Sequence, residues 1–261
     1  MIRFIVLLSC LFSQPAQALA EAADSLPDVR TLYREYIDAS GGYLNLESLS
    51  SVAIKATVND ISGSSFEMSV YRKRSSKVRL RKVYENYIEE LIYNGLEGWR
   101  ELSSLEGYQF ELKRLQLEEM TRAREMSRME GPFYLVGRDE RNISSLELDE
   151  VAGNLSYRVE VNPDSGLPYT TIWLDKESLE EVKIARKSKR SGNQILEEIY
   201  FTDPTTVEGH TFYQKQAVYV NGVHESTMEI SSIRINIGIY DNYFTRDSLN
   251  SASFLSPEIE P

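Results

Sequence analysis

The feature that most constrains this chain is the segment from Leu146 to Phe244, a nearly unbroken series of short runs in which apolar and polar residues alternate. Alternation with a period of two places apolar side chains on one face of a β-strand and polar ones on the other. Turn signals separate the runs, and Asn221-Gly222 is the strongest hairpin signal among them. The segment predicts a large antiparallel sheet.

The first half of the chain adds further strands with the same period. Apolar residues occupy every second position from Val52, and a fourth strand, Tyr87 to Tyr93, precedes Asn94-Gly95. The whole chain predicts about ten strands, and the apolar faces of the first three are Val52, Ile54, Ala56 and Val58, then Phe66, Met68 and Val70, then Val78 and Leu80.

Two stretches have the spacing of amphipathic helices. In the first, Ser25 and Asp28 are spaced as a capping box, and Gly41-Gly42 can end the helix. The second stretch ends at Gly131-Pro132. Their apolar stripes are Val29, Leu32, Tyr33, Tyr36 and Ile37 in the first, and Leu112, Leu115, Met120, Ala123, Met126 and Met129 in the second.

These elements predict an α+β fold that is mainly antiparallel β. A twisted sheet of about ten strands tends to curl, and helices laid across its hollow would cover the apolar concave face. The sequence contains no Pro/Gly/Ser-rich linker. We therefore expect residues 21–261 to form a single domain.

Residues 1–20 have the features of a secretory signal peptide. Arg3 is followed by an apolar stretch from Phe4 to Phe12, and Ala18-Leu19-Ala20 fits the cleavage rule. Cys10, the only cysteine, would leave with the signal, which favours a periplasmic location. Alternatively, Leu7-Leu8-Ser9-Cys10 is a lipoprotein signal that anchors the chain through Cys10. No later stretch is long and apolar enough for a transmembrane segment in the mature chain.

The composition and motifs disfavour several classes of function. A formal net charge of −11 disfavours nucleic-acid binding. His210 and His224 lack metal-ligand spacing, which favours surface or turn roles over metal ligation or general-base catalysis. No catalytic motif and no cofactor-binding motif is present. Paired acids such as Glu89-Glu90, Glu118-Glu119 and Glu197-Glu198 are typical of solvated charge.

The methionines of the second helical stretch have two interpretations. Methionine suits surfaces that repack around variable apolar ligands, and it equally suits a packed core. The spacing does not distinguish a cavity wall from core packing.

Several motifs, in order along residues 27–245, resemble those of the outer-membrane lipoprotein carrier and sorting superfamily, the LolA/LolB-like proteins. After the first helix and Gly41-Gly42, Lys73-Arg74-Ser75 is similar to the family's Lys-Arg-Pro step, although Ser75 replaces proline. Further similar steps are Asn94-Gly95 with Trp99, Leu174-Asp175, Phe201-Thr202-Asp203, Val207-Glu208-Gly209 and the closing segment from Ile233 to Phe244.

The resemblance implies an incomplete, half-open β-barrel whose helices form a lid over an apolar cavity. In the carriers this cavity holds lipoprotein acyl chains, and the arginine of the Lys-Arg-Pro step helps control the lid, which makes Arg74 its counterpart. The chain is longer than a typical carrier.

We therefore expect a periplasmic, non-enzymatic protein that binds acyl chains of a lipid or lipoprotein, with envelope membrane proteins as further partners. The alternative is an envelope scaffold module with a packed interior, and an enzyme is the third hypothesis. The candidate cavity residues are Phe66, Met68, Arg74, Trp99, Leu112, Leu115, Met120, Met126 and Trp173.

Overall fold

The computed structural model describes residues 26–190 and 193–249. The predicted signal peptide, Cys10 and Ser25 lie outside this range. Within it the chain forms one thirteen-stranded sheet in which every neighbouring pair is antiparallel, against the expectation of about ten strands. The first six strands are β1 (Ser51–Asp60), β2 (Ser65–Lys73), β3 (Lys77–Val83), β4 (Ile88–Tyr93), β5 (Gly98–Ser103) and β6 (Gln109–Arg114). The other seven are β7 (Ile143–Val151), β8 (Asn154–Val161), β9 (Tyr169–Asp175), β10 (Glu181–Arg190), β11 (Asn193–Val207), β12 (His210–Val220) and β13 (Val223–Ile235).

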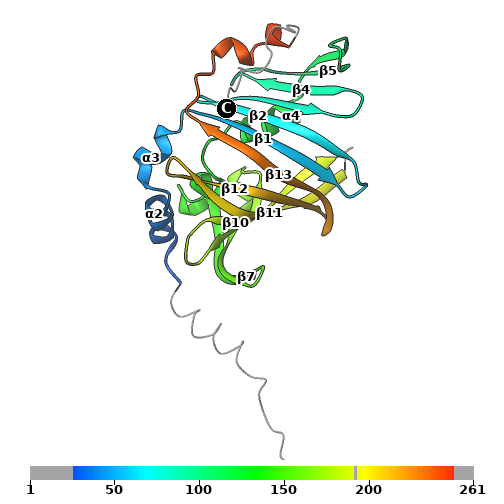
Figure 1. The fold of residues 1–261 in the computed structure, drawn as a ribbon. Coiled ribbons are helices and arrows are strands. Elements are labelled where there is room, and N and C mark those ends of the chain that lie inside the picture. Colours follow the sequence, from blue (N-terminus) through cyan, green and yellow to red (C-terminus); the bar gives the residue numbers. More distant parts are fainter. Residues whose placement is uncertain (1–25, 191–192, 250–261) are drawn as a thin grey trace, which may run out of the picture.

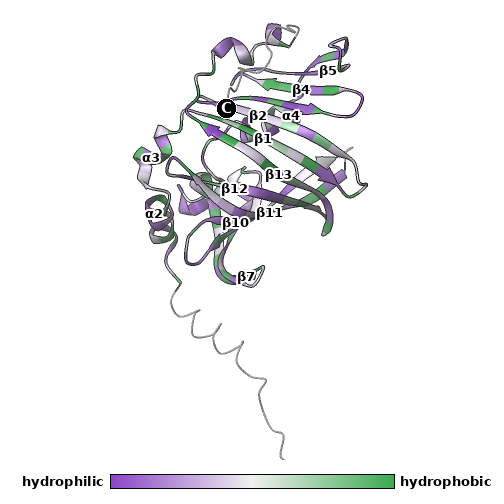
Figure 2. Ribbon diagram, viewed as in Figure 1, coloured by the Kyte–Doolittle hydropathy of each residue, from purple (hydrophilic) through white to green (hydrophobic). Residues whose placement is uncertain are grey.

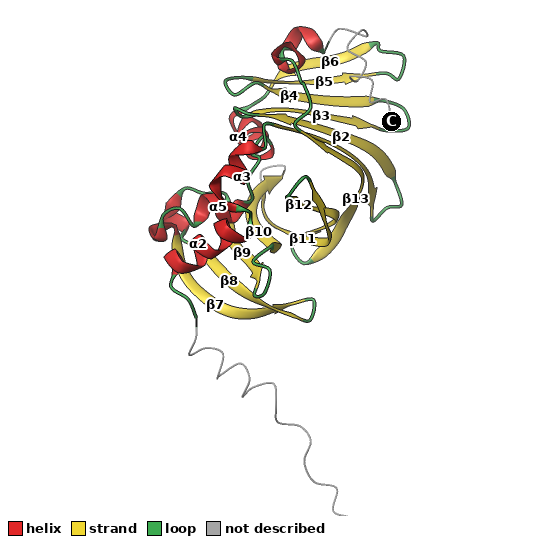
Figure 3. Ribbon diagram, turned by 60° about the vertical axis from the view of Figure 1, so that its left-hand side comes forward, coloured by secondary structure: helices red, strands yellow, loops and turns green. Residues whose placement is uncertain are grey.

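The sheet consists of two meanders joined in the middle. Its order is β6-β5-β4-β3-β2-β1-β13-β12-β11-β10-β9-β8-β7, so the pairing of β1 with β13 connects the two halves. β6 and β7 are free edges, and the curled sheet is therefore an open trough rather than a closed barrel (Figure 1, Figure 3). This arrangement confirms the predicted fold class. The predicted Asn221-Gly222 turn connects β12 to β13, with φ of 49° and 80° at its two residues.

The first predicted helix is confirmed as α2 (Val29–Ala39), followed by α3 (Gly42–Ser48). Its N-cap is Asp28, whose side chain accepts a hydrogen bond from the Thr31 amide at 2.9 Å. Gly41 and Gly42 both have positive φ, which glycine tolerates without strain, and they separate the two helices. The stripe buries Leu32, Tyr36 and Ile37.

The second predicted helix is wrong at both ends, because the helix begins after Leu115 and ends at Met126, before Met129 and Gly131. Leu112 lies in strand β6, where it pairs with Glu101 of β5. The helix is α4 (Leu117–Met126), which begins where the Glu119 carboxylate accepts a hydrogen bond from the Gln116 amide at 2.8 Å. The helical spacing of Leu112 and Leu115 is a coincidence. The pairing of this segment with β5 is what makes it a strand rather than a helix. A short helix α5 (Pro132–Val136) begins at the predicted stop, Gly131-Pro132.

The segment between β6 and β7 crosses from one edge of the sheet to the other. It carries α4, α5 and the 3₁₀ helix η1 (Glu140–Asn142), and with α2 and α3 it lies along the open side of the trough (Figure 3). We call α2–α5 the helical cover. α5 and α2 pack with β8–β10, and α4 packs with β3 and β4. No helix in the described residues is long and apolar enough to cross a bilayer.

The strands alternate apolar and polar residues (Figure 2). Two apolar clusters fill the concave side, one beneath α2 and α5 and the other beneath α4. On the convex side, the 3₁₀ helix η3 (Asp241–Phe244) packs Tyr243 and Phe244 on Ala53 and Tyr71. A further 3₁₀ helix, η2, spans Pro163–Ser165, and η4 spans Arg246–Ser248.

Candidate functional site

A cavity of about 390 Å³ lies between the helical cover and the middle of the sheet. Its volume is within the range of ordinary ligand pockets, about 300–1,000 Å³. Strands β1, β2 and β9–β13 supply its sheet wall, and α2, α3, the C-terminal end of α4 and the loop that follows α4 supply the opposite wall. The apolar lining comprises Leu46, Leu49, Ile54, Met126, Met129, Leu179, Ile184, Ile199, Phe201, Phe212 and Ile230. A wider depression of about 510 Å³ beside β4–β6 is more open to solvent, so we place the candidate site in the cavity of about 390 Å³, which is the more enclosed of the two.

Glu181 is a buried carboxylate in this cavity, with 8% of its surface exposed. An irregularity in the pairing with β9 places an extra residue, Val182, between Glu181 and Lys183. Glu181 therefore pairs with Leu174, whose side chain belongs to the concave core, and points to the same side. Simple alternation from Ile184 would have put Glu181 on the convex face.

The Glu181 carboxylate connects the sheet to the helical cover. Its Oε1 accepts hydrogen bonds from the Phe133 amide at 2.6 Å and from the Tyr36 hydroxyl at 3.2 Å. Burial raises the pKa of Glu181 to about 7, and these two hydrogen bonds offset part of that rise. Gly131 lies so close that a Cβ there would come within 2.5 Å of both carboxylate oxygens. A glycine at 131 is required by this close approach.

A second polar group links α4 to the sheet. Arg186 donates from Nε to Glu197 at 2.7 Å and from Nη1 to Glu125 at 3.5 Å. Burial raises the pKa of Glu125, although the charge of Arg186 opposes this. The prediction that Glu197-Glu198 is solvated is wrong for Glu197, which is 5% exposed and faces the interior beside Arg186.

Arg74 ties two parts of the helical cover to the end of β2. Its guanidinium donates from Nε to the Leu49 carbonyl at 2.7 Å and from Nη2 to the Leu46 carbonyl at 2.5 Å. Nη1 forms an ion pair with Glu130 at 2.6 Å, in the loop between α4 and α5. Arg74 therefore joins α3 and the loop between α4 and α5 to the end of β2.

The structure places the other candidate residues in three groups. Met126 lines the cavity, while Met68, Leu115 and Met120 belong to the adjoining core beneath α4. Phe66 is on the same face of β2 as Met68 but packs on Tyr84 in a tilted arrangement, with ring centroids 4.7 Å apart.

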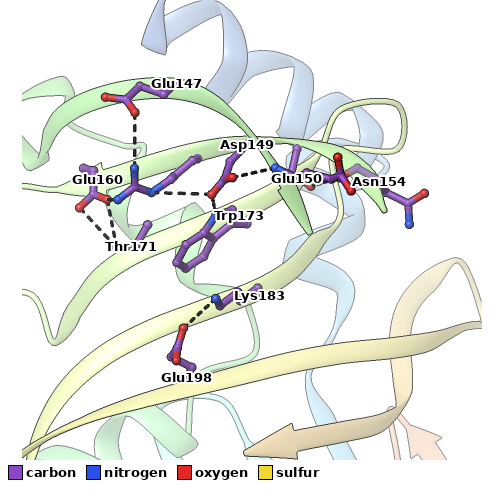
Figure 4. A network of polar contacts seen from close by, with 11 residues as sticks. Glu147, Asp149, Glu150, Asn154, Glu160, Thr171, Trp173, Lys183 and Glu198 are labelled. Atoms are coloured by element: carbon purple, nitrogen blue, oxygen red, sulfur yellow. Dashed lines mark hydrogen bonds and ion pairs between the residues drawn. The ribbon is translucent and has the colours of Figure 1, made fainter. Parts of the chain in front are cut away.

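The third group lies on the convex face and does not line the cavity. Trp99 is in a cross-strand row with Ile92, Arg79 and Tyr71, and Arg246 lies over its ring. Leu112 is two residues from Arg114, the partner of Trp99, and so shares its face. Trp173 donates to Asp149 at 2.9 Å within a convex-face polar network (Figure 4). Alternation in a strand shows only which residues share a face, so it does not identify the face that the helices cover.

Both histidines have hydrogen-bond partners. His210 lies at the start of β12, where its Nε2 is 3.3 Å from the Ser48 hydroxyl. Because His210 is buried, the prediction that it is a surface residue is wrong. His224 Nε2 lies 2.9 Å from the Thr227 hydroxyl. Across the described ranges, no group of three or more histidine, cysteine and acidic residues could hold a metal ion.

The fold is an open, curled antiparallel sheet whose helices cover a cavity. No family model matches the chain, and no curated protein matches its sequence. A DUF1329 family protein from Desulfovibrio piger is similar in structure, with a TM-score of 0.51, 11% identity, and coverage of 86% of this chain and all of the other. A domain from Vibrio parahaemolyticus described as an outer membrane lipoprotein-sorting protein has a TM-score of 0.50 and 14% identity, covering 89% of this chain and all of that domain.

A LolA superfamily protein from Nitrosomonas europaea has a TM-score of 0.45 at 11% identity, covering 77% of this chain and 91% of the other. The two structures with the higher TM-scores confirm, for the fold, the resemblance predicted from the sequence motifs.

Proposed function

We propose that this protein is a non-enzymatic periplasmic carrier that binds acyl chains of a lipid or lipoprotein in the cavity beneath its helical cover. The observation that carries the proposal is the cavity itself. An envelope scaffold would need a packed interior, whereas here a space of about 390 Å³ with an extensive apolar lining lies between the cover and the sheet. The fold shared with a lipoprotein-sorting domain supports the same proposal.

The helical cover meets the sheet at the cavity partly through localised polar links, formed by Arg74, Glu181 and Arg186. Phe133 of α5 and Ala123 of α4 are fully buried in the apolar cores, so these polar links are the contacts that can open without exposing apolar surface. Met126 is at the C-terminal end of α4, where the helix meets the cavity.

The test is binding of a fluorescent fatty acid such as cis-parinaric acid to the purified mature protein. Wild-type protein is expected to bind the probe saturably. Met126→Lys should abolish binding, because burying a charge in the wall that contacts the alkyl chain costs desolvation free energy. Its free energy of unfolding should fall by no more than about 1–3 kcal/mol, as for typical single substitutions.

The matched control is Leu117→Lys on the same helix, where the side chain is 83% exposed. This variant should bind the probe like the wild type. Wild-type protein that binds no acyl probe would contradict the proposal, and a Met126→Lys variant that unfolds would show that Met126 is a core residue.

A further inference from the structure

Two arginines at the cavity have no carboxylate partner in the described part of the chain. Arg72 shares the concave face of β2 with Val70, and its Nη1 donates to the backbone carbonyl of Arg128 at 3.3 Å. The Nε of Arg72 is enclosed and has no hydrogen-bond partner among the described residues. Arg128 also lines the cavity, and no ion pair of its side chain is found there.

This pair differs from the other cations around the cavity. Arg186 is paired with Glu125 and Glu197, and Arg74 is paired with Glu130. A guanidinium taken out of water without a counter-charge costs free energy, and it remains charged because its pKa is so high. Burial lowers the pKa of Arg72, with no nearby carboxylate opposing that effect. The fold therefore maintains one guanidinium, that of Arg72, that no acid neutralises, and beside it Arg128, whose charge acts on Glu125 without an ion pair.

A hydroxyl group adds a third donor beside this centre. Tyr169 of β9 lines the cavity and interacts electrostatically with both Arg72 and Arg128. Burial and the charges of Glu125 and Glu181 raise the pKa of Tyr169 to about 12, so its hydroxyl stays protonated and can donate a hydrogen bond. β2, β9 and the loop after α4 thus bring donors to one part of the cavity.

The carboxylates that line the same cavity interact with groups other than Arg72. Glu181 accepts from the Phe133 amide, Glu125 contacts Arg186, and Glu130 contacts Arg74. The three acids of the cavity are therefore bound by other groups, whereas the side chains of Arg72 and Arg128 form no ion pair among the described residues. Arginine binds carboxylate and phosphate oxygens through paired N–H donors, and such charge-assisted bonds are stronger than neutral ones.

We propose that the cavity binds an anionic amphiphile, with its carboxylate or phosphate head on Arg72, Arg128 and Tyr169 and its alkyl chain along Ile54, Ile184 and Phe212. This inference rests on the proposed function, because it assumes that the cavity accepts an alkyl chain. It adds that the head of the ligand carries negative charge and that Arg72 recognises this charge.

The experiment compares two probes that differ only in the charge of the head, cis-parinaric acid and its methyl ester, by fluorescence titration at pH 8. Wild-type protein should bind the acid about 10- to 100-fold more tightly than the ester, as expected for one or two hydrogen bonds to a charged group. Arg72→Gln should lower the affinity for the acid to that for the ester while leaving ester binding unchanged. Arg72→Lys, which keeps the charge, should retain part of the preference.

Two controls separate recognition of the head from folding. Arg158→Gln alters an arginine that pairs with Glu147 and Glu160 on the convex face, and this variant should keep the full preference for the acid. The melting temperature of Arg72→Gln should not fall, because the substitution removes an unpaired buried charge. Displacement of the acid by oleate or by a lysophosphatidate then shows whether a carboxylate or a phosphate head binds more tightly.

The outcomes distinguish the two proposals. Equal affinity of the wild type for acid and ester, or an unchanged preference in Arg72→Gln, would overturn the anionic head while leaving the acyl-chain carrier intact. Failure of both probes to bind would overturn the proposed function itself.

Discussion

At the scale of the residue, the most informative side chain is Glu181. Its burial beside Phe133 and Tyr36 makes the ionised form less favourable in the folded protein than in the unfolded chain. The folded pKa of about 7 is above the ordinary value of 4.5. The contribution of Glu181 to stability is therefore fully present below about pH 4.5 and is lost as the pH rises to about 7.

Glu181→Gln is expected to remove this pH dependence. The amide keeps a carbonyl oxygen in the place of Oε1, the atom that accepts both hydrogen bonds, and it does not titrate. Between pH 5 and pH 8 the free energy of unfolding of the variant should rise relative to the wild type by about 2–3 kcal/mol. Urea unfolding at both pH values measures the difference, and a difference that does not change with pH would contradict the raised pKa.

At the scale of the element, Arg74 holds the end of α3 and the loop between α4 and α5 against the end of β2. One side chain thus restrains two segments of the helical cover that are far apart in the sequence. The planar guanidinium can serve three separated acceptors at once, which an ammonium group does less well.

Arg74→Gln should loosen the helical cover without dissolving the sheet. Loss of charge-assisted bonds to one carboxylate and two carbonyls predicts a fall of about 1–3 kcal/mol in the free energy of unfolding. Hydrogen exchange should become faster in α3 and in residues 127–131, while β11 and β12 stay protected. Arg141→Gln is the control, because it breaks an exposed ion pair with Asp139; equal exchange in both variants would refute the role of Arg74.

At the scale of the whole molecule, the two meanders form one continuous sheet. β1 and β13 pair from Val52–Ile235 to Asp60–Ser226, and the helical cover packs on both halves. Separating the halves would expose backbone hydrogen-bonding groups and apolar surface along this junction. We therefore propose that the chain unfolds as a single domain.

The two tryptophans test this directly, since Trp99 is in the first meander and Trp173 in the second. Trp99→Phe leaves a fluorescence signal from the second half, and Trp173→Phe leaves one from the first. In each variant, the urea midpoint measured by fluorescence should coincide with that measured by far-ultraviolet circular dichroism. If the fluorescence midpoint lies above the circular-dichroism midpoint in one variant and below it in the other, the two meanders unfold independently.

From the sequence alone, the fold class and much of the local structure could be predicted. The alternation in β8 and β9, the hairpin at Asn221-Gly222 and the stripe of α2 all follow from short-range periodicity and turn chemistry, which depend on neighbouring residues. The ordered motifs that resemble those of the LolA/LolB-like proteins also predicted the half-open barrel and the helices that cover it. The boundary between β6 and α4 was not determined, because Leu112 and Leu115 satisfy both patterns until β5 pairs with the segment.

Only the tertiary structure decided which residues meet at the cavity. Trp99 and Trp173 have regular strand spacing, yet both lie on the convex face, which is opposite to the helical cover. Glu181 reaches the interior through one extra residue in β10, and Glu197 is buried because Arg186 lies opposite it. Whether a charge is solvated or buried depends on partners far along the chain, and a period-two pattern carries no information about those partners.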